Sequence, residues 1–118
     1  MTYNFKIDLE TYAKIGDIAC GLFSSCNDFL IEAVREGIRD FERFCTGYRN
    51  RDEARRAYLK THPCPDVPKE AFAFFTVRMP HILLDRLWEL HIKPISTFYR
   101  IWLLMYLEHP ISFWEGRE

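Results

Sequence analysis

Two short segments of this chain alternate strictly between apolar side chains and side chains that are mostly polar or charged. Because successive side chains of a β-strand point to opposite faces, each segment is predicted to be a strand with one buried and one free face. The free faces would carry Asn4, Lys6, Asp8, Phe74, Thr76 and Arg78. Hydrogen-bonding and charged groups set out in this way suit the binding of another surface, so these faces are where we look for function.

The residue types needed for catalysis do not occur at recognisable spacings. We find no nucleophile elbow, glycine-rich phosphate loop, metal triad or convincing pair of carboxylates in the sequence. We therefore expect no enzyme, no cofactor and no small-molecule substrate. His62 and Cys64 lie close together with Cys45 upstream, but their spacing matches none of the usual zinc patterns.

The composition is that of one globular domain, with 118 residues of which 48% are hydrophobic and 28% charged. No apolar run reaches the roughly 18 residues of a membrane span, and the N-terminus lacks the pattern of a secretory signal. The four cysteines, without a C-x-x-C pair, are therefore expected to be free thiols in a reducing compartment, the cytoplasm. The net charge of −1 is a mild argument against a nucleic-acid partner.

The first alternating segment is followed by two stretches of helical periodicity. We expect a strand over residues 3–9, a helix over residues 11–22 and a second helix that ends near Cys45. Ser24 or Ser25 would be the N-cap of the second helix, because a serine hydroxyl can accept a hydrogen bond from a free N–H group there.

The second alternating segment, predicted as a strand over residues 71–79, begins the same order again. One helix is expected over residues 81–92, and another from a Ser96 or Thr97 N-cap to about Glu108. The apolar positions of the two strands repeat at an offset of 70 residues: Phe5 with Phe75, Ile7 with Val77, and Leu9 with Met79. Two such halves, each too small to bury a core alone, would form one domain by pairing their strands.

A basic and proline-rich segment separates the two halves. Residues 48–62 hold five Lys or Arg against two acids, and a short helix is predicted over residues 52–60. The prolines that follow predict a stiff, extended linker. We divide the chain into a first repeat over residues 1–47, a linker over 48–70 and a second repeat with an apolar tail over 71–118, which together form one compact domain.

Strand, helix, capped turn, helix in about 45 residues resembles the ribbon-helix-helix module of the MetJ/Arc superfamily. The resemblance rests on residues 5–9 (FKIDL) and 25–35 (SCNDFLIEAVR) in the first repeat, and on residues 75–80 (FTVRMP) and the Ser96-Thr97 cap in the second. Because the module occurs twice, the chain is similar to duplicated transcription regulators of archaeal viruses. The resemblance implies a mostly α fold with a short β-ribbon, in which two repeats form an intramolecular pseudo-dimer around an antiparallel two-stranded sheet.

The resemblance also implies a function, the binding of double-stranded DNA by a transcription regulator. A two-stranded ribbon fits the major groove, where its free face contacts base edges. Arg78 could grip the O6 and N7 of guanine, and Lys6 could do so less specifically. Thr76 could form a hydrogen bond or contact a thymine methyl group, and Asn4 could read adenine. The full set of implied base contacts is Asn4, Lys6, Asp8, Phe74, Thr76 and Arg78. A plain solvated face of a sheet is the alternative for all six.

Two of these positions are unusual for a surface that faces DNA. Asp8 could accept a hydrogen bond from a cytosine amino group, or it could cap the helix that follows. Phe74 could stack against the edge of the duplex or contact a thymine methyl group. Since the outward residues of the two repeats differ, we expect them to read an asymmetric or imperfect palindrome.

The family's other contact is phosphate, held by N–H groups at the start of the second helix of each module. Ser25, Cys26, Ser96 and Thr97 match that position, whether or not they also serve as N-caps. The linker arginines could add flanking phosphate contacts or could form a charged, solvated helix; they are Arg49, Arg51, Arg55 and Arg56.

The last predicted helix is apolar almost all round, so it must be buried on more than one side. The linker helix and the C-terminal tail could cover it, or it could be a surface for self-association. The alternative function is a protein-binding module, antitoxin-like or a structural or virion component, that uses this apolar C-terminal half. DNA binding would weaken steeply with salt, whereas an apolar interface would not.

Overall fold

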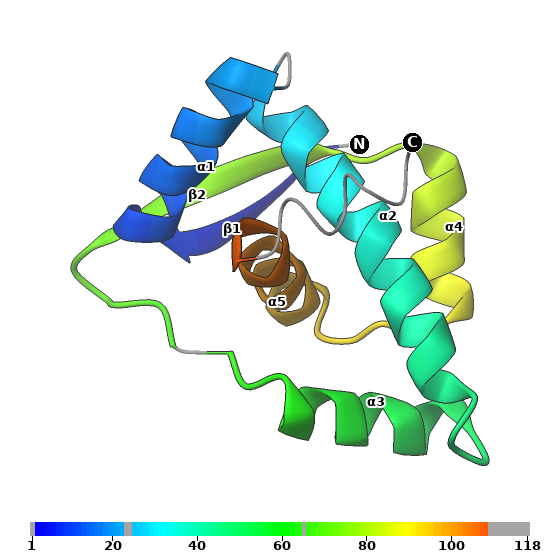
Figure 1. Ribbon diagram of the computed structural model, residues 1–118. Coiled ribbons are helices and arrows are strands. Elements are labelled where there is room, and N and C mark those ends of the chain that lie inside the picture. The colour runs from blue at the N-terminus through cyan, green and yellow to red at the C-terminus, as the bar shows by residue number, and fades with distance from the viewer. Residues whose placement is uncertain (1, 23–24, 65, 109–118) are drawn as a thin grey trace.

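A two-stranded antiparallel ribbon joins the two halves of the chain (Figure 1). In the computed structural model, which describes residues 2–22, 25–64 and 66–108 (the backbone alone for 19–22), β1 spans Thr2–Asp8 and β2 spans Phe72–Arg78. Both predicted strands are confirmed, with each end shifted by one residue. Phe5 lies opposite Phe75 in the register of the pair.

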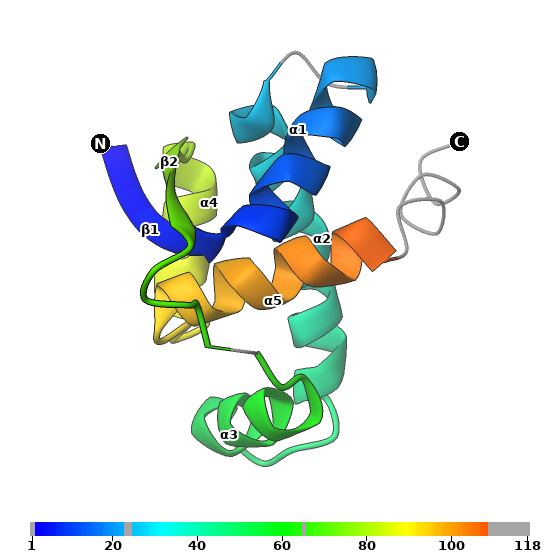
Figure 2. The same cartoon turned by 90° about the vertical axis from the view of Figure 1, so that its left-hand side faces the viewer.

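Each strand leads into two helices, and one more helix lies between the halves. The helices are α1 (Leu9–Leu22), α2 (Cys26–Cys45), α3 (Arg51–Thr61), α4 (His81–Glu89) and α5 (Ile95–Glu108). The fold is therefore mostly helical with one short sheet, and the order strand, helix, helix occurs twice, as the sequence predicts. α1, α2 and α5 pack against one face of the ribbon, whereas α4 lies beside α2, and α3 lies below α5 (Figures 1 and 2).

α5 is the centre of the core. Its buried side chains meet α2 on one side and the inward residues of the ribbon on the other. The ring of Phe29 lies 4.9 Å from that of Tyr106, and the ring of Tyr99 lies 5.5 Å from that of Phe5. These aromatic contacts explain why so apolar a helix follows the second strand: it is buried by the first half of the chain.

The linker helix α3 closes the remaining side of α5 through Tyr58, which is fully buried. The indole Nε1 of Trp102 donates a hydrogen bond to the Tyr58 hydroxyl at 3.0 Å, and that hydroxyl donates to Oδ2 of Asp40 at 2.7 Å. The ring of Tyr58 also stacks on that of Phe98. The linker helix therefore covers part of α5, one of the alternatives for this helix, while self-association through α5 and the tail stays a prediction. The apolar tail, residues 109–118, lies outside the described residues.

Two boundaries differ from the sequence prediction for physical reasons. Leu9 is not an inward strand residue; it is the first residue of α1 and half of its side chain is exposed (50%). The predicted helix over residues 81–92 ends at Glu89, because His91 takes a left-handed conformation with φ of 58°. Leu90 and Ile92 are still buried, although they lie beyond the end of the helix. The apolar pattern therefore identified these buried residues but not the position at which the helix ends.

None of the cysteines that the structure describes, Cys26, Cys45 and Cys64, forms a disulfide, and the side chain of Cys20 lies outside the described residues. Over the described ranges, none of the helices combines the length and the apolar character that crossing a membrane requires.

The contact between α2 and α5 leaves no room for a side chain at Gly37. A Cβ atom at this position would overlap the indole ring of Trp102, which is itself 1% exposed and cannot move aside. We expect Gly37→Ala to lower the free energy of unfolding by about 1–3 kcal/mol, as overpacking usually does. Urea unfolding of the variant measures this change.

Gly16 provides the matched control, because it is also a helical glycine but an added Cβ would meet no described atom within 4 Å. There, Gly16→Ala should stabilise the protein by about 0.5–1 kcal/mol through backbone entropy. Equal effects of the two substitutions would contradict the close approach of α2 and α5.

Candidate nucleic-acid interface

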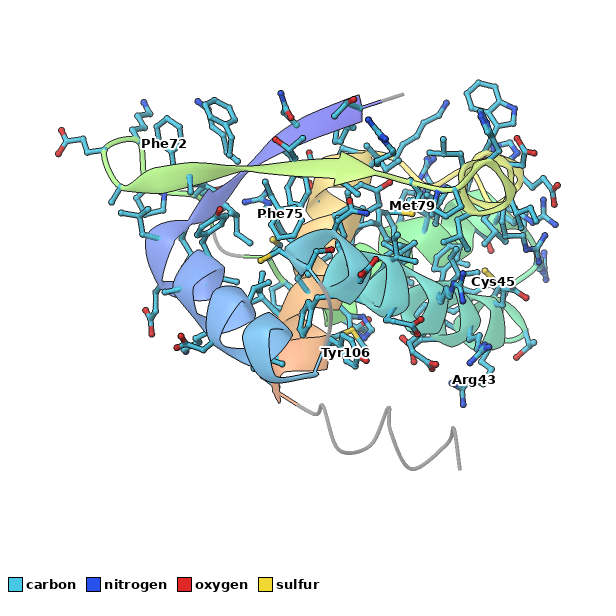
Figure 3. The ribbon with its side chains drawn as sticks, turned by 90° about the horizontal axis from the view of Figure 1, so that it is seen from above. Arg43, Cys45, Phe72, Phe75, Met79 and Tyr106 are labelled. Atoms are coloured by element: carbon cyan, nitrogen blue, oxygen red, sulfur yellow. The ribbon has the colours of Figure 1, made fainter. Side chains whose placement is uncertain are left out.

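The free face of the ribbon presents the side chains predicted to make base contacts. Asn4, Lys6, Phe74, Thr76 and Arg78 are exposed, and Asp8 is half-buried. The outward side chains form four cross-strand pairs: Thr2 with Arg78, Asn4 with Thr76, Lys6 with Phe74, and Asp8 with Phe72. Figure 3 shows Phe72 on this free side and Phe75 on the side of the helices. Among the described elements, none covers the free face.

Asn27 fixes the backbone of Arg78 at one end of the ribbon. Its Oδ1 accepts a hydrogen bond from the Arg78 N–H at 2.8 Å, and its Nδ2 donates to the Arg78 carbonyl at 3.3 Å. The strand end is thereby held against the first turn of α2, while the guanidinium remains exposed. Nothing in the sequence pairs residues 51 positions apart, so this clamp was missed.

Lys6 lies against an aromatic ring rather than extending freely. Its Nζ is 4.5 Å from the centre of the Phe72 ring, a cation–π contact that restrains the side chain. The ring of Phe72 in turn meets that of Phe74 edge to face, with centroids 5.4 Å apart. The end of the ribbon opposite Arg78 is therefore a small cluster of two aromatic rings and one ammonium group.

Asp8 is the N-cap of α1. Its Oδ2 accepts hydrogen bonds from the N–H and the hydroxyl of Thr11, at 3.0 and 2.9 Å. Partial burial acts to raise the pKa of Asp8, but the hydrogen bonds from Thr11 outweigh it, and the pKa lies below its ordinary value of 3.8. Capping, one of the two roles considered for this residue, is therefore what the structure shows.

The N-terminus of α2 lies beside the end of β2. Ser25 is its N-cap, as predicted, and its hydroxyl accepts a hydrogen bond from the N–H of Asp28 at 3.1 Å. Cys26 is the first residue of the helix and is half-buried. The carboxylate of Asp28 in this first turn favours the helix but repels a second anion.

The N-terminus of α5 lies beside the edge of β1, but its predicted caps are wrong. The helix begins at Ile95, and the Phe98 N–H donates to the carbonyl of Pro94, so Ser96 and Thr97 are residues of the first turn. The cause is that Pro94 cannot continue a helix backward yet fits just before its start. A groove of about 500 Å³ separates this turn from β1, and its charged lining residues are Lys6, Asp66, Lys69 and Arg100.

Two of the linker arginines are used within the protein. Arg51 donates to the carbonyl of Glu89 at 2.6 Å, and Arg55 donates to that of His91 at 3.2 Å. Arg51 therefore interacts with the last residue of α4, and Arg55 with the turn that follows it. Contact of either guanidinium with phosphate stays a prediction. Arg49 and Arg56 are exposed on the flank of the molecule where α3 lies, away from the free face of the ribbon.

Within the described ranges, no group of three or more His, Cys, Asp or Glu side chains is placed to hold a metal ion. No family model, no curated protein and no solved structure matches the chain. What the protein does must therefore be inferred from the geometry of the ribbon and its flanking helices.

The cap at Asp8 makes a testable contribution to stability. Asp8→Ala removes the acceptor of two hydrogen bonds and should lower the free energy of unfolding at neutral pH by about 1 kcal/mol. Because the pKa of Asp8 is lower in the folded protein than its ordinary 3.8, this stabilisation is complete above about pH 3.8 and is lost as the pH falls through the folded-state pKa. Urea unfolding of both proteins from neutral pH to about pH 3 should show the difference shrinking.

Asp8→Asn is the control for the charge, since asparagine keeps the capping oxygen but does not titrate. This variant should retain most of the stability at neutral pH and lose the pH-dependent part. A difference between wild type and Asp8→Ala that is independent of pH would contradict a charged cap.

Proposed function

We propose that the protein binds double-stranded DNA sequence-specifically, by placing the β1–β2 ribbon in the major groove, and that it acts as a transcription regulator. The observation that carries this proposal is the free ribbon flanked by two helix N-termini, that of α2 beside β2 and that of α5 beside β1. A groove about 12 Å wide admits a two-stranded ribbon. The backbone phosphates would then lie on both sides of it, where the helix N-termini are.

The strand register supports the second part of the proposal, a fused pair of ribbon-helix-helix modules. Phe5 pairs with Phe75, its own counterpart at the offset of 70 residues (75 minus 5). A local two-fold axis through the middle of the ribbon requires one cross-strand pair of this kind, in which the two residues occupy the same position in the two repeats. The packing agrees, because α2 contacts β2 as α5 contacts β1.

The two ends of the ribbon would make different contacts. Arg78, with its backbone fixed by Asn27, would present a guanidinium to the O6 and N7 of a guanine. Asn4 and Thr76, adjacent to it on the same face, can donate and accept hydrogen bonds to base edges. This half of the ribbon is therefore suited to hydrogen-bonded reading of the sequence.

The two helix N-termini also differ in their fitness for phosphate. The first turn of α5 contains no acidic residue, and the groove beside it is lined by three cations, Lys6, Lys69 and Arg100, against one acid, Asp66. The first turn of α2 contains Asp28. Since helix N-termini attract anions and a carboxylate opposes a second one, the stronger phosphate contact is proposed at α5, through the N–H groups of Ser96 and Thr97.

A protein-binding role remains the second candidate, and the apolar surface of α4 favours it. Ile82 and Trp88 are 81% and 80% exposed, although the exposed face of a helix usually carries polar side chains. Among the described residues, the large apolar side chains with the greatest exposure are therefore on α4 rather than on α5. The two functions respond differently to salt, since only phosphate contacts release counterions.

Selection of bound duplexes from a random pool tests the DNA proposal. The wild type should enrich a defined site, with affinity that falls by about 0.9 log units per log unit of salt for each phosphate contacted. Arg78→Ala should weaken binding to that site by about 1–3 kcal/mol and relax the preference at one base pair. Lys6→Ala should weaken binding as well, less specifically.

Arg43→Ala is the matched control, because it removes the same charge from an exposed position at the end of α2 remote from the ribbon (Figure 3). It should bind with the affinity and preference of the wild type. If Arg78→Ala and Lys6→Ala also select the same sites with unchanged affinity, the ribbon is not the DNA-binding surface.

A further inference from the structure

The free face of the ribbon divides into two chemically distinct halves at the Phe5–Phe75 pair. On one side lie the pairs Thr2–Arg78 and Asn4–Thr76, all hydrogen-bonding residues. On the other lie Lys6–Phe74 and Asp8–Phe72, where Asp8 is engaged with α1. The second half therefore offers any ligand two aromatic rings and one ammonium group.

Phe74 is the most prominent of these rings. It is 58% exposed, although the strand also carries Phe75, which is 2% exposed and packs inward. Phe72 supports its edge, and Lys6 is held over Phe72 rather than over Phe74. The ring of Phe74 therefore contacts one neighbouring ring, and more than half of its surface is exposed.

An exposed aromatic ring on a surface that faces the major groove favours some base edges over others. Base edges in the major groove carry hydrogen-bond donors and acceptors, which lose their water partners without replacement when an apolar ring covers them. The C5-methyl group of thymine is the apolar group that a standard base presents in this groove. A ring there is consequently favourable over thymine and unfavourable over guanine, cytosine or adenine.

We propose that Phe74 is a specificity-determining residue that reads thymine methyl groups in one half of the binding site, while the Arg78 half reads by hydrogen bonds. This inference rests on the proposed binding of duplex DNA. The positive charge of Lys6 and Arg78 on the same face favours a polyanion as the occupant of this apolar surface. Outward positions on one strand lie about 7 Å apart, close to two base-pair steps, so the methyl-reading segment covers about two adjacent base pairs.

Uracil in place of thymine tests the inference, because the two bases differ only by the methyl group. In the duplex selected by the wild type, thymines are replaced one at a time and the dissociation constant is measured by fluorescence anisotropy. We expect a loss of about fourfold per methyl at one or two adjacent positions, all in one half of the site. In the other half, where the methyl groups of Thr2 and Thr76 are the apolar groups of the outward residues, the same replacement should have a smaller effect.

Variants assign this effect to the ring. Phe74→Ser should bind the thymine duplex more weakly and should bind the thymine and uracil duplexes equally. Phe74→Leu, which restores an apolar side chain, should recover part of the difference. Trp88→Ala removes an exposed aromatic ring from α4 instead and should leave the difference unchanged, as should Arg78→Ala.

The outcomes separate this inference from the proposed function. If the wild type binds no duplex in a salt-dependent way, the DNA-binding proposal fails and this inference fails with it. If it binds a defined duplex but uracil replacement changes nothing, or if Phe74→Ser keeps the thymine preference, DNA binding stands and methyl reading by Phe74 is overturned.

Discussion

The pairing of β1 with β2 is the constraint on which the rest of the structure depends. A two-stranded ribbon is barely stable alone in water, so its inner face must be buried. Phe5 and Ile7 come from one end of the chain and Phe75 and Val77 from the other, and all four are at most 4% exposed. Neither half can bury its own strand without the helices of the other, since α1 contacts both strands and α5 lies against β1. The two halves therefore share one core, although the order of elements is repeated.

The linker between the two halves allows their strands to pair and also makes the surroundings of the two halves different. α3 is tied to the core by the chain of hydrogen bonds from Trp102 through Tyr58 to Asp40. Burial, together with the acceptor carboxylate of Asp40, raises the pKa of Tyr58, so that its hydroxyl stays neutral and can donate. Beyond α3 the proline-rich segment reaches a pocket beside α1 and α5 that Cys64 and Pro68 line, whereas the corresponding side between α2 and α4 is an open groove. One connection thus gives two similar halves different surroundings.

Local signals in the sequence predicted most of the elements but few of the contacts between them. Alternation identified both strands, and the Ser25 cap was confirmed because capping involves only residues three apart. The Asn27 clamp on Arg78 and the use of Arg51 at the end of α4 join residues 51 and 38 positions apart, which no local pattern encodes. The wrong prediction of an N-cap at Ser96 or Thr97 has another origin. Both are good capping residues, but the helix begins before them, at Ile95, directly after Pro94.

In the ribbon, the residues that pack against the core are different from the residues that are available for binding. The inward residues Phe5, Ile7, Phe75 and Val77 are buried against the helices, so they can change little without cost to the core. The outward side chains are mostly exposed, and hydrogen bonds to the helices are made by Asp8 and by the backbone of Arg78, so these side chains can diverge with less cost to the core. A symmetric dimer of separate chains would have to change both halves at once, because each substitution would appear twice. In a single chain, Phe74 can stand where Asn4 stands in the other half, and one rigid frame can present hydrogen-bonding groups at one end and an apolar ring at the other.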